Sequence, residues 1–171
     1  LELVPILNKI DLPSAEPDRV AHEVEDVIGL PCMDAPRVSA KMGVGIQDVL
    51  ERVITDIPAP KGDADAPLKA LIFDAVYDPY KGVIVYLRVF DGRLSVGEPV
   101  KLMQTGAQFT PVEVGHMGAT ALAPCGTLEA GEVGYFTASI KTLEDTRVGD
   151  TITGVSAPTA EALPGYRKVR S

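Results

Sequence analysis

Two short polar motifs hold residue types that can recognise a nucleobase. The first is Asn8-Lys9-Ile10-Asp11, which follows the apolar run 3–7. The carboxylate of Asp11 can accept two hydrogen bonds from the N1 imino and N2 amino groups of guanine, a donor pair that adenine lacks. Asn8 can bond another edge of the base through its amide, and Lys9 can lay its aliphatic stem over the ring. The motif therefore predicts a guanine-binding site. Such a site rejects other bases, because they would leave its polar groups without hydrogen-bond partners.

The second motif is Ser39-Ala40-Lys41, at the end of the short run 36–40. Here we expect the backbone N–H of Ala40 to donate to guanine O6. Ligands of open α/β sheets bind beyond the carboxyl ends of strands, so both motifs belong at one edge of a sheet. Asn and Asp are also common in turns, which is the structural alternative. Two such motifs, each at a strand end, favour binding.

The elements around these motifs alternate between strand and helix. The apolar runs 3–7 and 36–40 predict short buried strands. Apolar residues at helical spacing predict a helix that begins at Pro17 and stops at Gly29, and a second from about Ile46 to Asp56. This βαβα order indicates a parallel sheet over residues 1–57.

A different pattern follows the proline-rich segment 58–67, which we interpret as a linker. Residues 68–157 are rich in β-branched and aromatic side chains, and Asp91-Gly92 predicts a hairpin. A recurring turn predicts positive φ at Gly97, Gly131 and Gly149. Many short strands in so few residues predict a small closed β-barrel, followed by an exit segment at 158–171. The predicted strands are 68–77, 83–90, 99–104, 109–117 and 133–140.

Charge and composition restrict the function classes. Apolar residues make up 46% of the chain and charged ones 23%, which excludes disorder, and the apolar runs are too short to span a bilayer. The net charge of -8 is uneven, because residues 1–66 hold 6 basic and 13 acidic side chains whereas residues 67–171 hold 10 and 11. Only the second part can approach a phosphate backbone without strong repulsion. The cysteines and histidines have no metal-ligand spacing, so we expect no metal site.

Together the two motifs resemble the guanine-reading pair of the translation-factor GTPases. Further segments are similar to the LepA family of these factors: 57–63, 66–74, 77–83, Asp91-Gly92 and 101–106. The resemblance covers nearly the whole chain and implies the end of a G domain followed by the second, barrel domain of a ribosome-binding elongation GTPase. It also implies GTP or GDP with Mg²⁺ in the whole protein, and a role in back-translocation or in translation under stress. The implied partners are rRNA, small-subunit proteins and tRNA, with no DNA, in the bacterial cytoplasm and at times peripherally on the inner membrane.

One departure from the family limits what this chain can do. The sequence holds no G-x-x-x-x-G-K-[ST] loop to hold phosphates. The family's phosphate-sensing D-x-x-G occurs as 26–29, but inside the first predicted helix, where Gly29 is expected to act as a C-terminal cap. We therefore expect a piece of a longer protein, without catalytic residues, inactive alone and without tight nucleotide binding. The alternatives are another translation GTPase, of the translocase or TypA type, or a non-enzymatic barrel that binds RNA or protein.

The loop 77–82 has two interpretations. Tyr77, Asp78, Tyr80 and Lys81 can form a ribosome-facing loop that stacks on or bonds to RNA. Alternatively, the loop only connects two strands, and its tyrosines cover one end of the barrel. We interpret the basic residues Arg167, Lys168 and Arg170 as the solvated beginning of a following domain. Finally, we expect residues 1–56 to be the less stable part of the chain.

Overall fold

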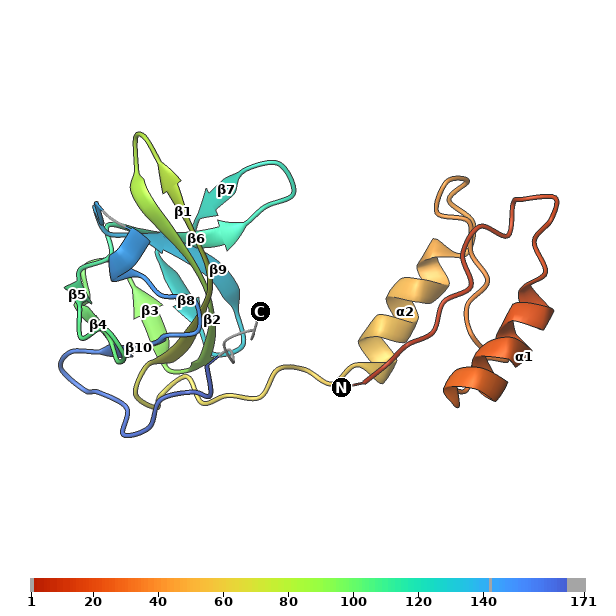
Figure 1. Cartoon of the computed structure of the whole chain (residues 1–171), viewed down its shortest axis with the longest axis horizontal. Coiled ribbons are helices and arrows are strands. Elements are labelled where there is room, and N and C mark those ends of the chain that lie inside the picture. The colour runs from red at the N-terminus through yellow and green to blue at the C-terminus, as the bar shows by residue number, and fades with distance from the viewer. Residues whose placement is uncertain (1, 142, 166–171) are drawn as a thin grey trace. The chain divides into compact units, whose positions relative to one another are not determined.

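The computed structural model describes residues 2–141 and 143–165 of the chain (Figure 1). The fold divides into two compact units, Leu1–Ala59 and Pro60–Ser171. The first contains two helices, and the second is built almost entirely of antiparallel strands. Each unit has its own core.

Both predicted helices of the first unit are confirmed. Helix α1, Pro17–Ile28, begins at a proline, whose fixed φ suits the first helical turn. It ends at Gly29, which has a φ of 73° and donates its N–H to the carbonyl of Glu25, so the C-cap interpretation of this glycine is correct. Helix α2 spans Ile46–Asp56, as its apolar spacing predicted.

The loop after α1 is fastened to the helix by Glu25. One carboxylate oxygen, Oε1, accepts the backbone N–H groups of Cys32 at 2.8 Å and Met33 at 3.0 Å. These two bonds favour the ionised carboxylate and lower the pKa of Glu25. The contact places Cys32 in a small core with Leu7, Ala21 and Ala35.

The predicted strands at 3–7 and 36–40 are wrong as extended elements. Only one parallel bridge joins the two runs, between Leu7 and Arg37. Leu7 donates its N–H to the carbonyl of Pro36 at 2.9 Å and accepts that of Val38 at 2.8 Å. An apolar run becomes a strand only where neighbours pair along it, and one bridge satisfies few backbone groups. The parallel direction is nevertheless the one that the βαβα order required.

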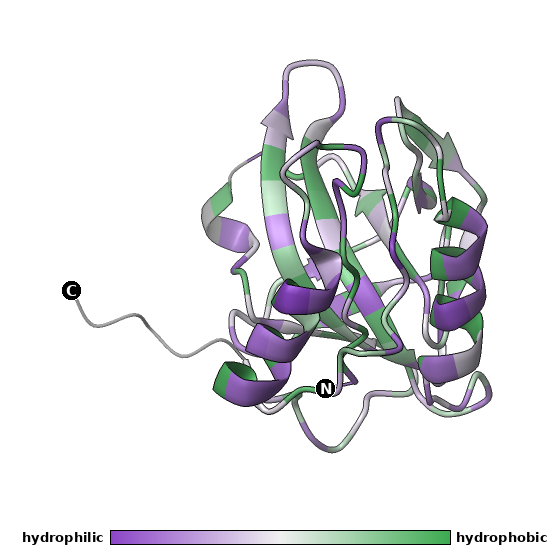
Figure 2. Ribbon diagram, turned by 90° about the vertical axis from the view of Figure 1, so that its right-hand side faces the viewer, coloured by the Kyte–Doolittle hydropathy of each residue, from purple (hydrophilic) through white to green (hydrophobic). Residues whose placement is uncertain are grey.

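The apolar faces of both helices are largely exposed. Figure 2 shows apolar and polar positions along both helices. In α2 no residue is buried, and Ile54 and Leu50 are 74% and 53% exposed. In α1 only Ala21 is buried. Most helical stability comes from packing an apolar face, so this unit has few contacts with which to resist unfolding.

The second unit is a β-barrel that surrounds one apolar core. Eight strands form an antiparallel sheet in the order β5-β4-β10-β1-β2-β9-β6-β7, and β3 pairs with β8 in a separate ribbon. The strands are β1 (Lys69–Asp78), β2 (Gly82–Asp91), β3 (Arg93–Ser95), β4 (Val100–Leu102), β5 (Gln108–Phe109), β6 (Glu113–Met117), β7 (Leu122–Pro124), β8 (Thr127–Glu129), β9 (Val133–Thr137) and β10 (Thr151–Gly154). A short 3-10 turn, η1, spans Leu143–Asp145. The core includes fully buried Leu94 and Leu128, which face each other across the ribbon, together with Phe136 of β9.

Strand prediction was correct for the long elements and incomplete for the short ones. The run 109–117 is split between β5 and β6, the runs 99–104 and 133–140 form shorter strands than expected, and β3, β7, β8 and β10 were missed. The turn glycines Gly97, Gly131 and Gly149 all have positive φ, as predicted.

The hairpin predicted at Asp91-Gly92 is wrong. Strand β2 pairs with β1 and β9, whereas β3 pairs with β8, so the chain crosses here from one sheet to the other. Gly92 has a φ of 74°, and a Cβ on it would lie 2.6 Å from the backbone of Leu68. Glycine is needed at this corner because two backbone segments meet, which a dipeptide signal cannot distinguish from a hairpin.

Candidate functional site

The two predicted guanine-reading motifs meet in space, although they lie about thirty residues apart in the sequence. The side-chain Oδ1 of Asn8 accepts the backbone N–H of Ala40 at 3.1 Å. The hydroxyl of Ser39 donates to Oδ1 of Asp11 at 2.7 Å. Each motif therefore positions a side chain of the other, and the pair forms one polar cluster at the Leu7–Arg37 bridge.

Ser39 acts as a positioning residue within this cluster. It is fully buried, and its hydroxyl accepts the N–H of Met42 at 3.1 Å while it donates to Asp11. Asp11 itself is exposed, and among the described residues its second carboxylate oxygen has no partner. The hydroxyl thus fixes the orientation of a carboxylate that still has acceptor capacity for a ligand.

Ala40 is placed differently from expectation. Its N–H is already bonded to Asn8 and is not free to donate to guanine O6. Asn8 also accepts the N–H of Lys9 at 2.7 Å, so its amide oxygen holds both motifs in place. The sequence could not reveal this bond, because it depends on the spacing of the two chain segments. Lys41 is exposed, and its side chain forms no hydrogen bond or ion pair with the described residues.

The backbone at Lys9 is strained. Its φ is 67°, in the left-handed region that non-glycine residues seldom adopt. Such strain persists only where surrounding contacts hold it, and it is concentrated at functional sites. A cavity of about 290 Å³ adjoins this residue on the side of α1, where Leu12, Glu16 and Arg19 contribute to its walls.

The fit of a guanine nucleotide to this chain is partial. The second carboxylate oxygen of Asp11, which has no partner among the described residues, can accept a hydrogen bond from a base, and the buried Ser39 holds that carboxylate in place. Among the residues that the structure describes, no three His, Cys, Asp or Glu side chains gather as a metal site would require.

The loop 77–82 is the turn between β1 and β2, which pair up to Asp78 and Gly82. The strand-connection interpretation is therefore correct in its topology, but its tyrosines do not cover the barrel. Tyr80 is 96% exposed and Tyr77 is 56% exposed. Asp78 accepts the N–H groups of Tyr80 and Lys81 through Oδ1, both at 2.8 Å, and these bonds lower its pKa.

Lys81 is tied to the barrel wall. Its Nζ lies 2.6 Å from Oε1 of Glu113, which also accepts the hydroxyl of Tyr135 at 2.8 Å. The lysine and tyrosine both stabilise the ionised form and lower the pKa of Glu113. Burial, followed by the bond to Glu113, raises the pKa of Tyr135 to about 12. We refer to Lys81, Glu113 and Tyr135 as the wall cluster.

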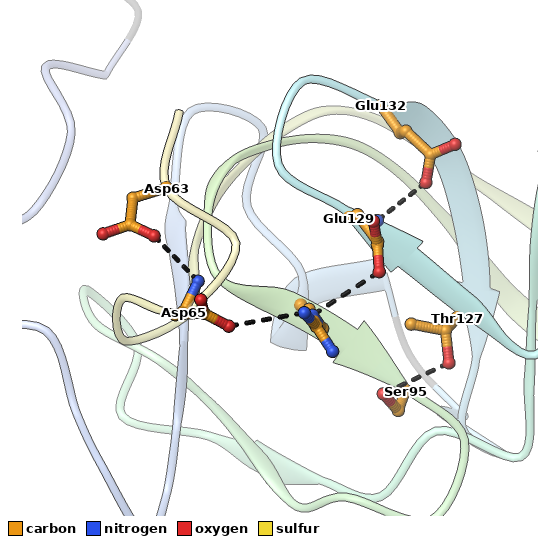
Figure 3. Close-up of polar contacts among 7 residues, drawn as sticks. Asp63, Asp65, Ser95, Thr127, Glu129 and Glu132 are labelled. Atoms are coloured by element: carbon orange, nitrogen blue, oxygen red, sulfur yellow. Dashed lines mark hydrogen bonds and ion pairs between the residues drawn. The ribbon is translucent and has the colours of Figure 1, made fainter. Parts of the chain in front are cut away.

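A separate cleft of about 730 Å³ lies over the outer face of the β3–β8 ribbon, beside the segment 64–68. Arg93 pairs there with Asp65 at 3.4 Å and with Glu129 at 3.5 Å. Figure 3 shows how this chain of contacts continues from Asp63 to Glu132. Because the arginine is shared between two carboxylates, it is not free for an anionic ligand.

Comparisons with known proteins show which class of protein this chain resembles. Residues 82–153, which hold most of the barrel strands, match the family model described as elongation factor Tu domain 2, so the barrel is similar to a translation-factor domain. Over 99% of its length the chain is 60% identical to Elongation factor 4 of Agathobacter rectalis, 57% to that of Bacillus velezensis and 55% to that of Bacillus subtilis. Elongation factor 4 is the LepA protein, and the resemblance of this chain to it is confirmed. The chain spans 28% of the length of these curated relatives.

Two further expectations concern the rest of the chain. The basic residues Arg167, Lys168 and Arg170 lie outside the described residues. In the part of the chain that the structure describes, neither helix has the length and apolar character that a membrane crossing requires.

Proposed function

We propose that this chain is part of a ribosome-dependent translation GTPase of the elongation factor 4 type. Residues 1–57 form the guanine-recognition half of a G domain, 58–67 a linker, 68–157 the second domain and 158–171 the segment leading out of it. The observation that carries the proposal is the joining of Asn8 to Ala40 and of Asp11 to Ser39, which brings both base-reading motifs into one cluster. The similarity to Elongation factor 4 over 99% of the chain supports the same assignment.

The work of the nucleotide site is divided between this chain and the remainder of the protein. Asn8, Lys9 and Asp11 recognise the base, and the segment 39–41 positions them. In the whole protein GTP or GDP binds with Mg²⁺, but the phosphate-binding loop occurs nowhere in these 171 residues. Hydrolysis therefore requires parts of the protein beyond this sequence, and the chain alone is expected to be inactive.

The barrel supplies the contact with the ribosome. The exposed Tyr77 and Tyr80 at the β1–β2 turn are suited to such a contact, and the barrel part is nearly neutral, with 10 basic and 11 acidic residues over 67–171. The partners are rRNA and small-subunit proteins, with tRNA bound by the whole protein in the cytoplasm. We do not propose the peripheral membrane association, since no observation favours it.

A change of base specificity tests the guanine assignment. A carboxylate at position 11 accepts from N1–H and from the N2 amino group, whereas an amide accepts from N1–H and donates to the O2 of xanthine. We expect GMP, but not AMP, to shift the NMR signals of residues 8–11 and 39–42 at millimolar concentration, and Asp11→Asn to prefer XMP over GMP. Asp34→Asn, at another exposed carboxylate of the first unit, is the matched control and should keep the GMP preference.

Equal shifts with AMP and GMP, or an Asp11→Asn variant with unchanged preference, would contradict guanine recognition. In that case the chain would be better described as a barrel module that binds RNA or protein.

A further inference from the structure

A groove of about 380 Å³ lies beside the tip of the β1–β2 turn. Its walls come from the segments 77–82 and 139–141, which are far apart in the sequence. Val83 donates its N–H to the carbonyl of Ile140 at 2.9 Å, which fastens the segments together. A Cβ on Gly82 would lie 2.7 Å from the same carbonyl, so only glycine permits this approach.

The turn that forms one wall is held in a defined conformation. Asp78 fixes the backbone at Tyr80 and Lys81, and the wall cluster anchors Lys81 to β6 and β9. This ordered turn nevertheless leaves the ring of Tyr80 almost fully in water. The ring contributes little apolar burial to the barrel, so its presence on a fixed turn favours a contact with a ligand.

The opposite wall supplies polar groups. Ser139 has a φ of 55°, a strained conformation for a residue other than glycine. Lys141 is exposed, and its ammonium makes no ion pair with any described residue. Lys81, by contrast, is neutralised by Glu113. The groove therefore combines exposed aromatic rings with a hydroxyl and with an ammonium that pairs with none of the described carboxylates.

We propose that this groove binds one unpaired RNA nucleotide, with its base stacked on Tyr80 and its phosphate paired with Lys141. The proposal rests on the ribosome-contacting role given above and names the partner of that surface. Proteins read single-stranded RNA by stacking exposed bases on aromatic rings, with lysine contacts to the backbone. Paired bases keep their faces inside the duplex, so the groove selects loops, bulges or ends. Its volume falls within the range of small-ligand pockets.

The test is an NMR titration of the ¹⁵N-labelled chain with single-stranded hexa-adenylate, and with the same strand in an RNA duplex. The single strand is expected to shift the amides of Tyr80, Lys81 and Ile140, and the duplex is not. Tyr80→Ala should weaken binding roughly tenfold, within the range for loss of one stacked base, and Tyr80→Phe should retain it. Lys141→Ala should weaken binding and flatten its salt dependence. Lys101→Ala is the matched control, since Lys101 is an exposed lysine on β4.

Three outcomes would overturn the inference: no shift of groove amides, equal binding of the duplex, or unchanged binding by Tyr80→Ala. Cosedimentation with small ribosomal subunits separates this failure from that of the proposed function. If the wild-type chain and the Tyr80→Ala variant cosediment equally well, only the groove proposal is contradicted. If the wild-type chain does not cosediment, the ribosome contact itself is contradicted. Variants that lose cosedimentation but bind hexa-adenylate normally would assign the groove to a ribosomal protein, against the RNA proposal.

Discussion

Replacing Glu113 tests how the β1–β2 turn is held to the barrel. Oε1 of Glu113 is the acceptor for both the Tyr135 hydroxyl and the Lys81 ammonium. Tyr135 is fully buried, so removing its acceptor costs about 1–3 kcal/mol. The ion pair is 40% and 29% exposed at its two side chains, and such pairs contribute roughly 0.2–1 kcal/mol. We therefore expect Glu113→Ala to lower the free energy of unfolding by about 2 kcal/mol.

Glu113→Gln is the matched variant, because its amide oxygen can still accept both bonds. It loses only the charge, so we expect a cost of about 0.5 kcal/mol. Urea denaturation of both variants, monitored by far-UV circular dichroism, measures the difference in their free energies of unfolding. Equal costs for the two variants, or an alanine variant as stable as wild type, would refute the reasoning.

The same cluster makes the stability of the barrel dependent on pH. Tyr135 keeps its proton in the folded state up to a pKa of about 12, whereas the unfolded chain releases it near 10. Between these values the folded state binds more protons, so stability falls as the pH rises. In Glu113→Ala we expect the pKa of Tyr135 to move back toward 10 and to stay above it, because burial, its largest cause, remains. Absorbance of tyrosinate during alkaline titration measures this shift.

Three further results are expected. Amide hydrogen exchange should be fast over residues 2–59, where local opening costs roughly 0–2 kcal/mol. It should be slow in the barrel, where the free energy of opening approaches that of global unfolding, at least about 5 kcal/mol. Uniform protection of both parts would contradict this expectation. Gly134→Ala should lower the free energy of unfolding by about 2 kcal/mol or more, because a Cβ would lie 2.2 Å from a backbone oxygen of β6. Gly97→Ala, where a Cβ meets open space but φ is positive, should lower it by only about 1 kcal/mol in the same urea assay. Acidification through the lowered pKa of Glu25 should weaken its bonds to the loop after α1, so the protection factors of the Cys32 and Met33 amides, corrected for intrinsic exchange at each pH, should fall as the pH falls and stay constant with pH in Glu25→Gln.

The helices were predictable because their signals are local. Pro17 and Gly29 mark the ends of α1 through backbone conformations that each residue favours by itself. Strand pairing depends on partners far along the chain, and Asp91-Gly92 illustrates the limit. The dipeptide correctly indicates a positive φ, but whether the flanking strands pair is decided by β1, β8 and β9.

The candidate site was predictable in its residues and only partly in its geometry. Asn8 and Asp11 were identified from side-chain chemistry, and the structure joins them to the segment 39–41. The engagement of the Ala40 N–H was missed, since it depends on a bond between segments 32 residues apart. Ser139 and Lys141 carried no sequence signal, because one is an ordinary hydroxyl and the other a lone lysine until the fold places them beside Tyr80.

The central claim is that this chain reads the guanine base and leaves the phosphates to other parts of the protein. Titration with GMP, GDP with Mg²⁺, and ADP with Mg²⁺ tests it most directly, by NMR or calorimetry. We expect millimolar affinity at best, worth about 4 kcal/mol, with GDP binding no tighter than GMP and ADP binding more weakly than both. Micromolar binding of GDP, or equal binding of ADP, would contradict it.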